Sequence, residues 1–139
     1  MSQKKLGFGL MRLPKDDNGV ILLDQVQERI TMNRFGFGAM RLPLINPDDK
    51  QSIDMDELKR MVDIYMEAGF TYFDTAWMYC GFASENAAKE ALVSRYPRDA
   101  YTLATKLHSG FIKTKEDRDH IFNEQLSKTG VEYFDYYLW

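Results

Sequence analysis

The stretch Gly69-Phe-Thr-Tyr-Phe-Asp-Thr-Ala-Trp-Met-Tyr79 is the most informative part of this chain. It predicts an apolar β-strand that carries a carboxylate, Asp74, near its end and is followed by a phenol, Tyr79. A second stretch, Tyr101-Thr-Leu-Ala-Thr-Lys106, predicts another strand, and this one ends on an ammonium group. If the two strands are parallel, all three polar side chains lie at the same rim of the sheet.

An ammonium group, a carboxylate and a phenol at one rim can form a proton-delivery site. A nearby cation favours the phenolate and so lowers the pKa of a phenol from about 10, while a carboxylate keeps the cation charged and oriented. A phenol in this setting can act as a general acid. We therefore interpret Tyr79 as a proton donor with Asp74 and Lys106 as its partners. The alternative, an ordinary ion pair beside a packing tyrosine, stays open on these residues alone.

Outward from these stretches, strand patterns alternate with helix patterns. Short apolar runs bounded by Gly, Pro or polar residues predict four strands, at residues 35–41, 72–76, 101–106 and 133–139. Three helices lie between them, each with a capping residue and a stop: Asp54 with Glu57 and then Gly69, Ser84 and then Pro97 after Tyr96, and Thr114 with Asp117 and then Gly130. This alternation predicts an α/β fold with a parallel sheet and right-handed crossovers.

Several of these motifs, in this order, resemble the aldo-keto reductase family, and bacterial members in particular. The resemblance covers about three quarters of the chain. It rests on Asp74-Thr-Ala-x-x-Tyr79, Ser84-Glu85 with Leu92, Thr105-Lys106, Phe35-Gly-Phe-Gly-Ala-Met-Arg-Leu-Pro43 and Val131-Glu-Tyr-Phe-Asp-Tyr-Tyr-Leu-Trp139.

The resemblance implies a TIM-type (β/α)8 barrel that reduces aldehyde or ketone groups of small molecules with NADP(H) or NAD(H). In that family a tyrosine protonates the carbonyl, and an aspartate, a lysine and a histidine complete a tetrad. The matching catalytic residues here are Tyr79, Asp74 and Lys106. The implied cofactor contacts are Gly38, Ala39, Met40 and Asp74, and a substrate pocket would include Trp77 and His108.

The length of the sequence limits this expectation. Such barrels typically need about 250 residues, whereas this sequence has 139. We expect the first four β/α units, at residues 35–139, without the family's histidine, which follows a strand similar to Asp135-Tyr-Tyr-Leu-Trp139. Weak or no cofactor binding is expected of this chain alone, and the open edge of its fourth strand favours self-association. The alternative function is an inactive fragment or interaction module that retains the half-barrel scaffold.

The N-terminus repeats the first strand. Leu6-Gly-Phe-Gly-Leu-Met-Arg-Leu-Pro14 is nearly identical to Phe35-Gly-Phe-Gly-Ala-Met-Arg-Leu-Pro43. Repeat arrays need about three or more units, and only the second copy continues into a complete helix and second strand. We therefore assign residues 1–34 to a duplicated segment outside the barrel.

Composition excludes several other classes of protein. The chain is 45% hydrophobic and 28% charged with a formal net charge of -3, so no basic patch for nucleic acid is predicted. A single cysteine and the lack of a signal peptide or membrane span indicate a cytoplasmic protein. Cys80, His108 and His120 match no zinc spacing, so no metal is expected. Gly36-x-Gly38-x-x-Arg41 lacks the third glycine of a dinucleotide-binding loop, which argues against a Rossmann site.

Overall fold

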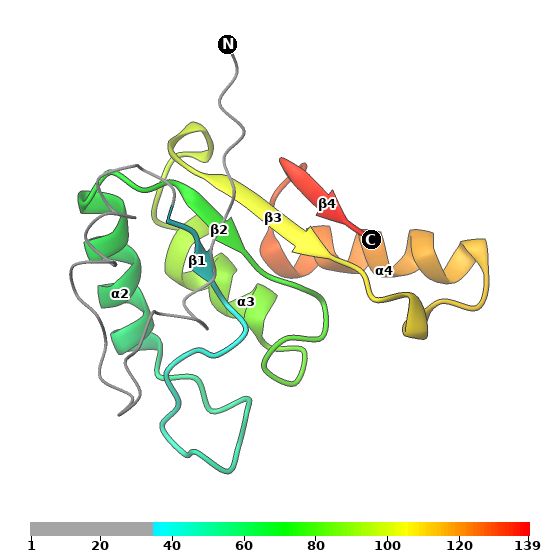
Figure 1. Cartoon of the computed structure of the whole chain (residues 1–139), viewed down its shortest axis with the longest axis horizontal. Coiled ribbons are helices and arrows are strands. Elements are labelled where there is room, and N and C mark those ends of the chain that lie inside the picture. The colour runs from blue at the N-terminus through cyan, green and yellow to red at the C-terminus, as the bar shows by residue number, and fades with distance from the viewer. Residues whose placement is uncertain (1–34) are drawn as a thin grey trace, which may run out of the picture.

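The structure is a computed structural model that describes residues 35–139. Its centre is a parallel sheet in the order β1-β2-β3-β4, formed by β1 (Phe37–Gly38), β2 (Tyr72–Asp74), β3 (Thr102–Lys106) and β4 (Tyr136–Leu138). Helices connect successive strands and lie on one face of the sheet (Figure 1): α2 (Met55–Glu67), α3 (Ser84–Ala88) continued by η2 (Lys89–Val93), and α4 (Lys115–Thr129). Two short helical turns flank β3 in the chain: η3 (Arg98–Ala100) precedes it and η4 (Ser109–Phe111) follows it. The predicted alternation and parallel sheet are confirmed, although each strand is shorter than predicted.

The ends of α2 follow from local chemistry. The Asp54 side chain accepts a hydrogen bond from the Glu57 backbone N–H at 3.0 Å, which satisfies one of the free N–H groups of the first turn. Leu58, Val62 and Tyr65 recur at helical spacing and are buried. Just beyond the helix, Gly69 adopts a φ of +83°, a left-handed conformation that side chains with a Cβ rarely adopt.

The prediction that Ser84 caps the second helix is wrong. Ala83 occupies the cap position and makes no side-chain capping bond, whereas Ser84 is the first helical residue and is buried. Its hydroxyl donates to the Ala39 carbonyl at 2.9 Å and lies 2.8 Å from the Thr75 hydroxyl. A partner distant in sequence therefore outcompetes the local backbone for this side chain. The helix also ends at Val93, and not at Tyr96 as predicted.

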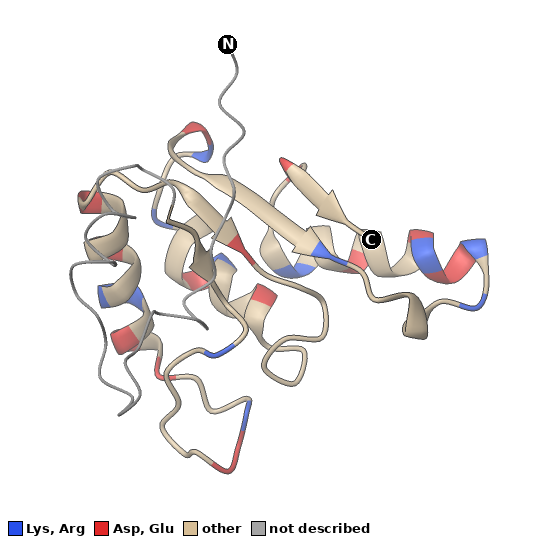
Figure 2. Ribbon diagram, in the orientation of Figure 1, with Lys and Arg blue, Asp and Glu red and all other residues tan. Residues whose placement is uncertain are grey.

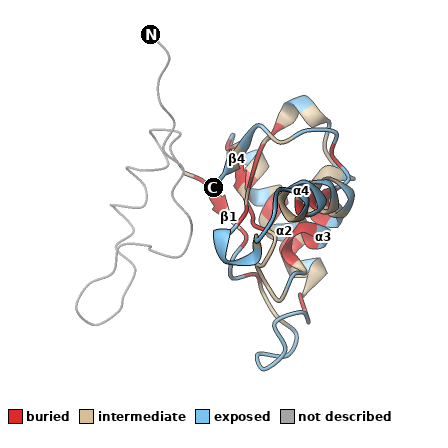
Figure 3. Ribbon diagram, turned by 90° about the vertical axis from the view of Figure 1, so that its right-hand side faces the viewer, coloured by how far each residue is buried: buried red, intermediate tan, exposed pale blue. Residues whose placement is uncertain are grey.

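An aromatic cluster fills the space between the sheet and α2. Phe37, Tyr65, Phe70 and Phe73 pack with ring centroids 5.0–5.4 Å apart. The buried Tyr65 hydroxyl lies 2.6 Å from the carbonyl of Phe35, so its polar end has a partner, and burial raises the pKa of this phenol. Figure 3 shows the buried residues along the layer between strands and helices, and exposed residues on the outer faces of the helices. This packing holds the strands that present the candidate site.

The predicted duplicate at residues 1–34 lies outside the described residues. Within residues 35–139, no helix is both long enough and apolar enough to cross a membrane. Figure 2 shows acidic and basic residues interspersed over the helices and loops.

The cap of α4 provides a test of this local chemistry. The Thr114 hydroxyl accepts from the Asp117 N–H at 3.1 Å, and the Asp117 carboxylate accepts in return from the Thr114 N–H at 2.9 Å. Removing the hydroxyl leaves the Asp117 N–H without its protein partner, so we expect Thr114→Ala to lower the free energy of unfolding by about 1 kcal/mol. Urea denaturation measures this loss. Ser127→Ala, at an exposed position of the same helix, should not lower stability, and an equal loss in both variants would contradict the capping role.

Candidate active site

Asp74 and Lys106 meet at the ends of neighbouring strands. The parallel pairing of β2 with β3 sets Asp74 opposite Ala104, two residues before Lys106 on the same face of the sheet. The Lys106 ammonium forms an ion pair with the Asp74 carboxylate and donates to the Thr75 carbonyl at 3.1 Å. Figure 2 shows the acidic end of β2 beside the basic end of β3. The ammonium group is therefore held in one place by two oxygen atoms.

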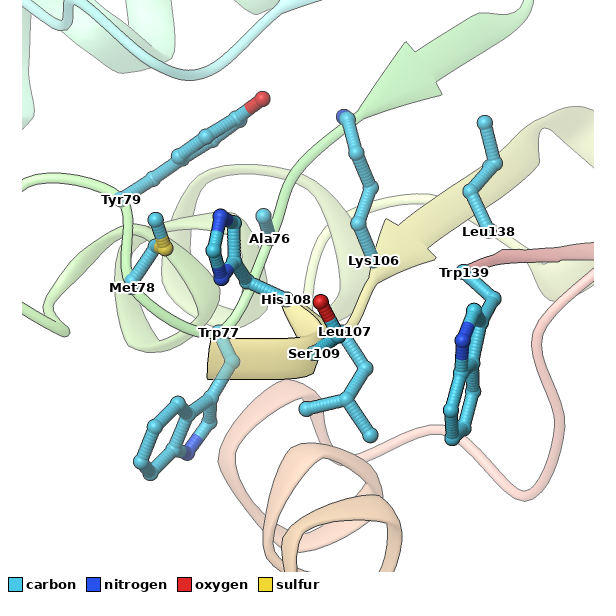
Figure 4. Close-up of a pocket in the computed structure, with 10 residues that line it drawn as sticks. All are labelled: Ala76, Trp77, Met78, Tyr79, Lys106, Leu107, His108, Ser109, Leu138 and Trp139. Carbon is cyan, nitrogen blue, oxygen red and sulfur yellow. The ribbon is translucent and has the colours of Figure 1, made fainter. Parts of the chain in front are cut away.

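Tyr79 lies in the loop after β2 and reaches the same rim. The Lys106 Nζ atom is 4.8 Å from the centroid of the Tyr79 ring, which is within the range of a cation–π contact. Figure 4 shows the Tyr79 hydroxyl and the Lys106 amino group projecting to the same side of the rim. The structure thus brings together all three residues of the predicted proton-delivery site.

A pocket of about 370 Å³ opens beside this group. Both residues of the predicted substrate pocket, Trp77 and His108, line it, but the Trp77 ring points away from the Tyr79 hydroxyl in Figure 4. Instead it packs edge-on against Phe82 and Phe111, at centroid distances of 4.8 and 5.1 Å. Sequence analysis did not predict the other lining residues: Ala76, Met78, Leu107, Ser109, Leu138 and Trp139.

The three predicted cofactor contacts on and after β1 differ in what they offer a ligand. The Ala39 side chain is buried in the core, its N–H donates to the Asp74 carbonyl at 2.8 Å and its carbonyl accepts from Ser84. Its polar groups therefore already have partners. Met40 is 44% exposed and Gly38 is half-buried, so these two residues are the ones open to a ligand. None of the three lines the pocket beside Lys106.

The turn that follows Tyr79 is strained. Cys80, Gly81 and Phe82 have φ angles of +52°, +59° and +72°, and a left-handed conformation costs about 1–2 kcal/mol for each residue with a Cβ. Two contacts maintain it: the Gln51 side-chain amide donates to the Gly81 carbonyl at 2.6 Å, and the Phe82 ring packs on Trp77. Strain of this kind persists where the surrounding structure fixes the backbone, and here it directly follows Tyr79, the predicted proton donor. Burial raises the pKa of the Cys80 thiol.

A buried polar network lies on the other face of β3. The fully buried Glu85 carboxylate accepts from the Thr105 hydroxyl and from the Gln125 amide, both at 2.8 Å. The Tyr137 hydroxyl donates to the Gln125 carbonyl oxygen at 2.7 Å. The Lys128 ammonium lies 3.3 Å from the second oxygen of Glu85, an ion pair without hydrogen-bond geometry. The network ties α3, α4, β3 and β4 together immediately behind Lys106.

Sequence analysis missed this network, although the amino-acid sequence holds a signal of it. Glu85 lies on the same helix face as the buried Leu92, seven residues later. A carboxylate on a buried face requires hydrogen-bond partners, but their identity depends on residues 20 and 40 positions away.

Within residues 35–139, no group of three or more His, Cys, Asp and Glu side chains is placed to hold a metal ion. His120 is exposed on α4, and His108 lies at the pocket. The structure therefore does not bring Cys80, His108 and His120 together as one ligand set.

Comparisons with known proteins agree with this geometry. Residues 34–139 match the family model described as Aldo/keto reductase family. A comparison with curated proteins found no match.

Among solved structures, an aldo-keto reductase from Klebsiella pneumoniae in complex with NADPH is similar, with a TM-score of 0.59 and 19% identity. One from Brucella melitensis gives a TM-score of 0.54 and 25% identity. In both cases the match covers 73% of this chain but only 33% and 34% of the other chain, respectively. The chain thus spans about a third of the length of these structures, in agreement with the predicted partial (β/α)8 barrel.

The buried network predicts a dependence of stability on alkaline pH. Burial, together with the nearby Glu85 carboxylate, raises the pKa of Tyr137 to about 12, and Arg118 opposes this rise. The unfolded phenol titrates near pH 10, so the stabilisation is complete below that pH and is lost as the pH rises toward 12. We expect Tyr137→Phe to flatten the fall in the urea midpoint between about pH 10 and 12. Tyr133→Phe, at an exposed tyrosine, is the control, and equal slopes for both variants would contradict the prediction.

Proposed function

This chain belongs to the aldo/keto reductase family, and on that premise we propose that it provides the proton-donating part of an NAD(P)H-dependent reductase. The substrate class is small molecules with an aldehyde or ketone group, which the reaction converts to an alcohol. The observation that carries this proposal is the convergence of Asp74, Tyr79 and Lys106 beside a pocket of about 370 Å³. Because the chain spans about a third of its structural neighbours, the activity of the whole protein is part of the proposal.

Tyr79 is the proposed proton donor, acting through its hydroxyl oxygen on the substrate carbonyl. Lys106 is its electrostatic partner: its ammonium faces the phenol ring and stabilises negative charge that develops on the oxygen as the proton leaves. Asp74 holds this ammonium group in place through the ion pair. The contact of Lys106 with the Thr75 carbonyl restricts it further.

The residues present fit one end of a nicotinamide cofactor. Met78, Leu138 and Trp139 line the pocket with apolar side chains, which suit a flat ring. Gly38 on β1 and Met40 just after it are open to a ligand. When bound, the cofactor supplies the hydride. NADP(H) is favoured because a structural neighbour was solved with NADPH and another with NADP. The contribution of this chain is to position the reacting groups, which accounts for a large part of such catalysis.

The proton donor is tested with Tyr79→Phe, which removes one oxygen and retains the ring over Lys106. We expect the rate of aldehyde-dependent NADPH oxidation to fall at least about a hundredfold, since a general acid contributes about 10² to 10⁴ in rate. Binding of NADPH, followed by its fluorescence, should stay within about twofold of the original protein, a margin under about 0.5 kcal/mol. Tyr136→Phe, on the exposed face of β4, should retain turnover.

Two outcomes would contradict the proposal. Retained turnover in Tyr79→Phe would remove this residue as the proton donor. Weak or no NADPH binding is expected of this chain alone, so these assays apply to a complete barrel, in which the chain is part of a longer polypeptide or pairs with a complementary fragment. The absence of both NADPH binding and turnover in that complete barrel would instead favour the alternative function, a catalytically inactive half-barrel scaffold or interaction module.

The role of Lys106 predicts that activity and stability respond differently to its loss. The Lys106 and Asp74 side chains are 29% and 26% exposed, and partly exposed ion pairs contribute about 1 kcal/mol or less to stability. We expect Lys106→Met to leave the urea midpoint nearly unchanged while turnover falls at least about tenfold, or about 1.4 kcal/mol of transition-state stabilisation. Lys128→Met is the matched control. This lysine pairs with the buried Glu85, so Lys128→Met should lower the urea midpoint more than it lowers turnover. A larger loss of stability in Lys106→Met, or a larger loss of turnover in Lys128→Met, would contradict the assignment.

A further inference from the structure

The backbone directly after Tyr79 is a left-handed turn. Cys80, Gly81 and Phe82 have φ angles of +52°, +59° and +72°, so two residues with a Cβ hold a conformation that such residues rarely adopt. Beyond the turn, the Ser84 N–H donates to the Tyr79 carbonyl at 3.2 Å. The direction in which the Tyr79 phenol leaves the rim therefore depends on this turn keeping its shape.

A side chain from the loop between β1 and α2 holds the middle of the turn. The Gln51 side-chain amide donates to the Gly81 carbonyl at 2.6 Å, although the two residues are 30 positions apart in the sequence. The approach is close, since a Cβ at Gly81 would lie 3.2 Å from the Gln51 Cγ atom, tighter than ordinary van der Waals contact. Glycine at this position therefore permits both the left-handed φ and the approach of the glutamine. Figure 1 shows the loops after β1 and β2 at the same end of the sheet.

The loop that carries Gln51 is itself held by hydrogen bonds. The Gln51 backbone N–H donates to the Asp49 carboxylate at 2.9 Å, and the Gln51 backbone carbonyl accepts from the Ile53 N–H at 2.8 Å. Across the base of the loop, the Ile45 N–H donates to the Ser52 carbonyl at 2.7 Å. The Gln51 side chain therefore extends from a fixed backbone, and its amide ties the turn to this loop.

We propose that Gln51 is a positioning residue for the reaction: by holding the Gly81 carbonyl, it keeps the Tyr79 hydroxyl beside the Lys106 ammonium. This inference rests on the proposed role of Tyr79 as proton donor, and Gln51 acts through Tyr79 and not on the substrate. Proton transfer requires the phenol oxygen within hydrogen-bond reach of the substrate carbonyl. A misplacement of about 1 Å can cost about a hundredfold in rate. Since the Lys106 Nζ atom lies 4.8 Å from the Tyr79 ring centroid, a loosened turn would also weaken that contact.

The exposure of Gln51 separates positioning from global stability. The Gln51 side chain lies at the surface, so loss of its amide donor should loosen the turn locally and leave the rest of the fold intact. Cys80 reports on such loosening because it is the single cysteine of the chain and lies inside the turn. Its thiol is half-buried, and the Sγ atom is 3.6 Å from the carbonyls of Ala39 and Met40. Opening of the turn would release this contact and expose the thiol.

Labelling of Cys80 by N-ethylmaleimide, a neutral reagent, tests the turn in this chain without cofactor or substrate. Gln51→Met removes the amide donor and keeps a side chain of similar length. We expect its labelling rate to rise about fivefold, which corresponds to about 1 kcal/mol, the usual net contribution of one hydrogen bond, with little change in the urea midpoint. Lys50→Met, at the neighbouring exposed position, is the matched control and should label at the original rate. Equal labelling of the two variants would overturn the proposal.

Turnover in the complete barrel gives the second test. In Gln51→Met we expect kcat to fall at least about threefold, a small part of the loss that a misplacement of about 1 Å can bring. The KM for the aldehyde should stay within about twofold, because groups that contact the substrate are unchanged. Lys50→Met should retain both constants. Faster labelling of Cys80 with an unchanged kcat would overturn the positioning role, whereas failure of the proposed function would show as retained turnover in Tyr79→Phe.

Discussion

The register between β2 and β3 is the constraint on which the rest of the site depends. Asp74 pairs with Ala104, and this alignment places the Asp74 carboxylate within reach of the Lys106 ammonium. Both side chains lie on the face of the sheet opposite α2, α3 and α4 (Figure 1), called here the open face. A shift of one residue would turn the side chains of a strand to the opposite face of the sheet. Lys106 would then face the helices, and Thr105 would face the pocket. The ion pair, the contact with Tyr79 and the pocket all follow from this one alignment.

The two faces of β3 hold the register from opposite sides. On the helix face, Thr105 joins the buried network of Glu85 and Gln125, whose amide also lies 3.2 Å from the Lys106 carbonyl. Buried polar groups are costly without partners and specific when they have them, so this network favours one alignment of strands and helices. On the open face, the same strand presents Lys106 to solvent and to Tyr79.

Local features of the fold were predictable from sequence. The cap at Asp54, the capping box of Thr114 with Asp117, and the stops at Gly69 and Gly130 are all present in the structure. Each depends on residues within four positions of one another, where side-chain length and backbone preference decide the outcome. Ser84 shows where such reasoning fails. Its sequence context predicts a cap, but its hydroxyl bonds Ala39, which is 45 positions away.

By itself, the sequence determined the order of strands and helices, the family, and the three residues that meet at the rim, because these depend on short motifs and on the direction of parallel strands. Only the tertiary structure decided that Ala39 has no free polar group, that Trp77 points away from Tyr79, and that a buried network backs Lys106. The physical reason is that a buried polar or aromatic side chain takes the partner that packing brings to it. That partner comes from a segment tens of residues away in the sequence, and no local sequence pattern identifies it.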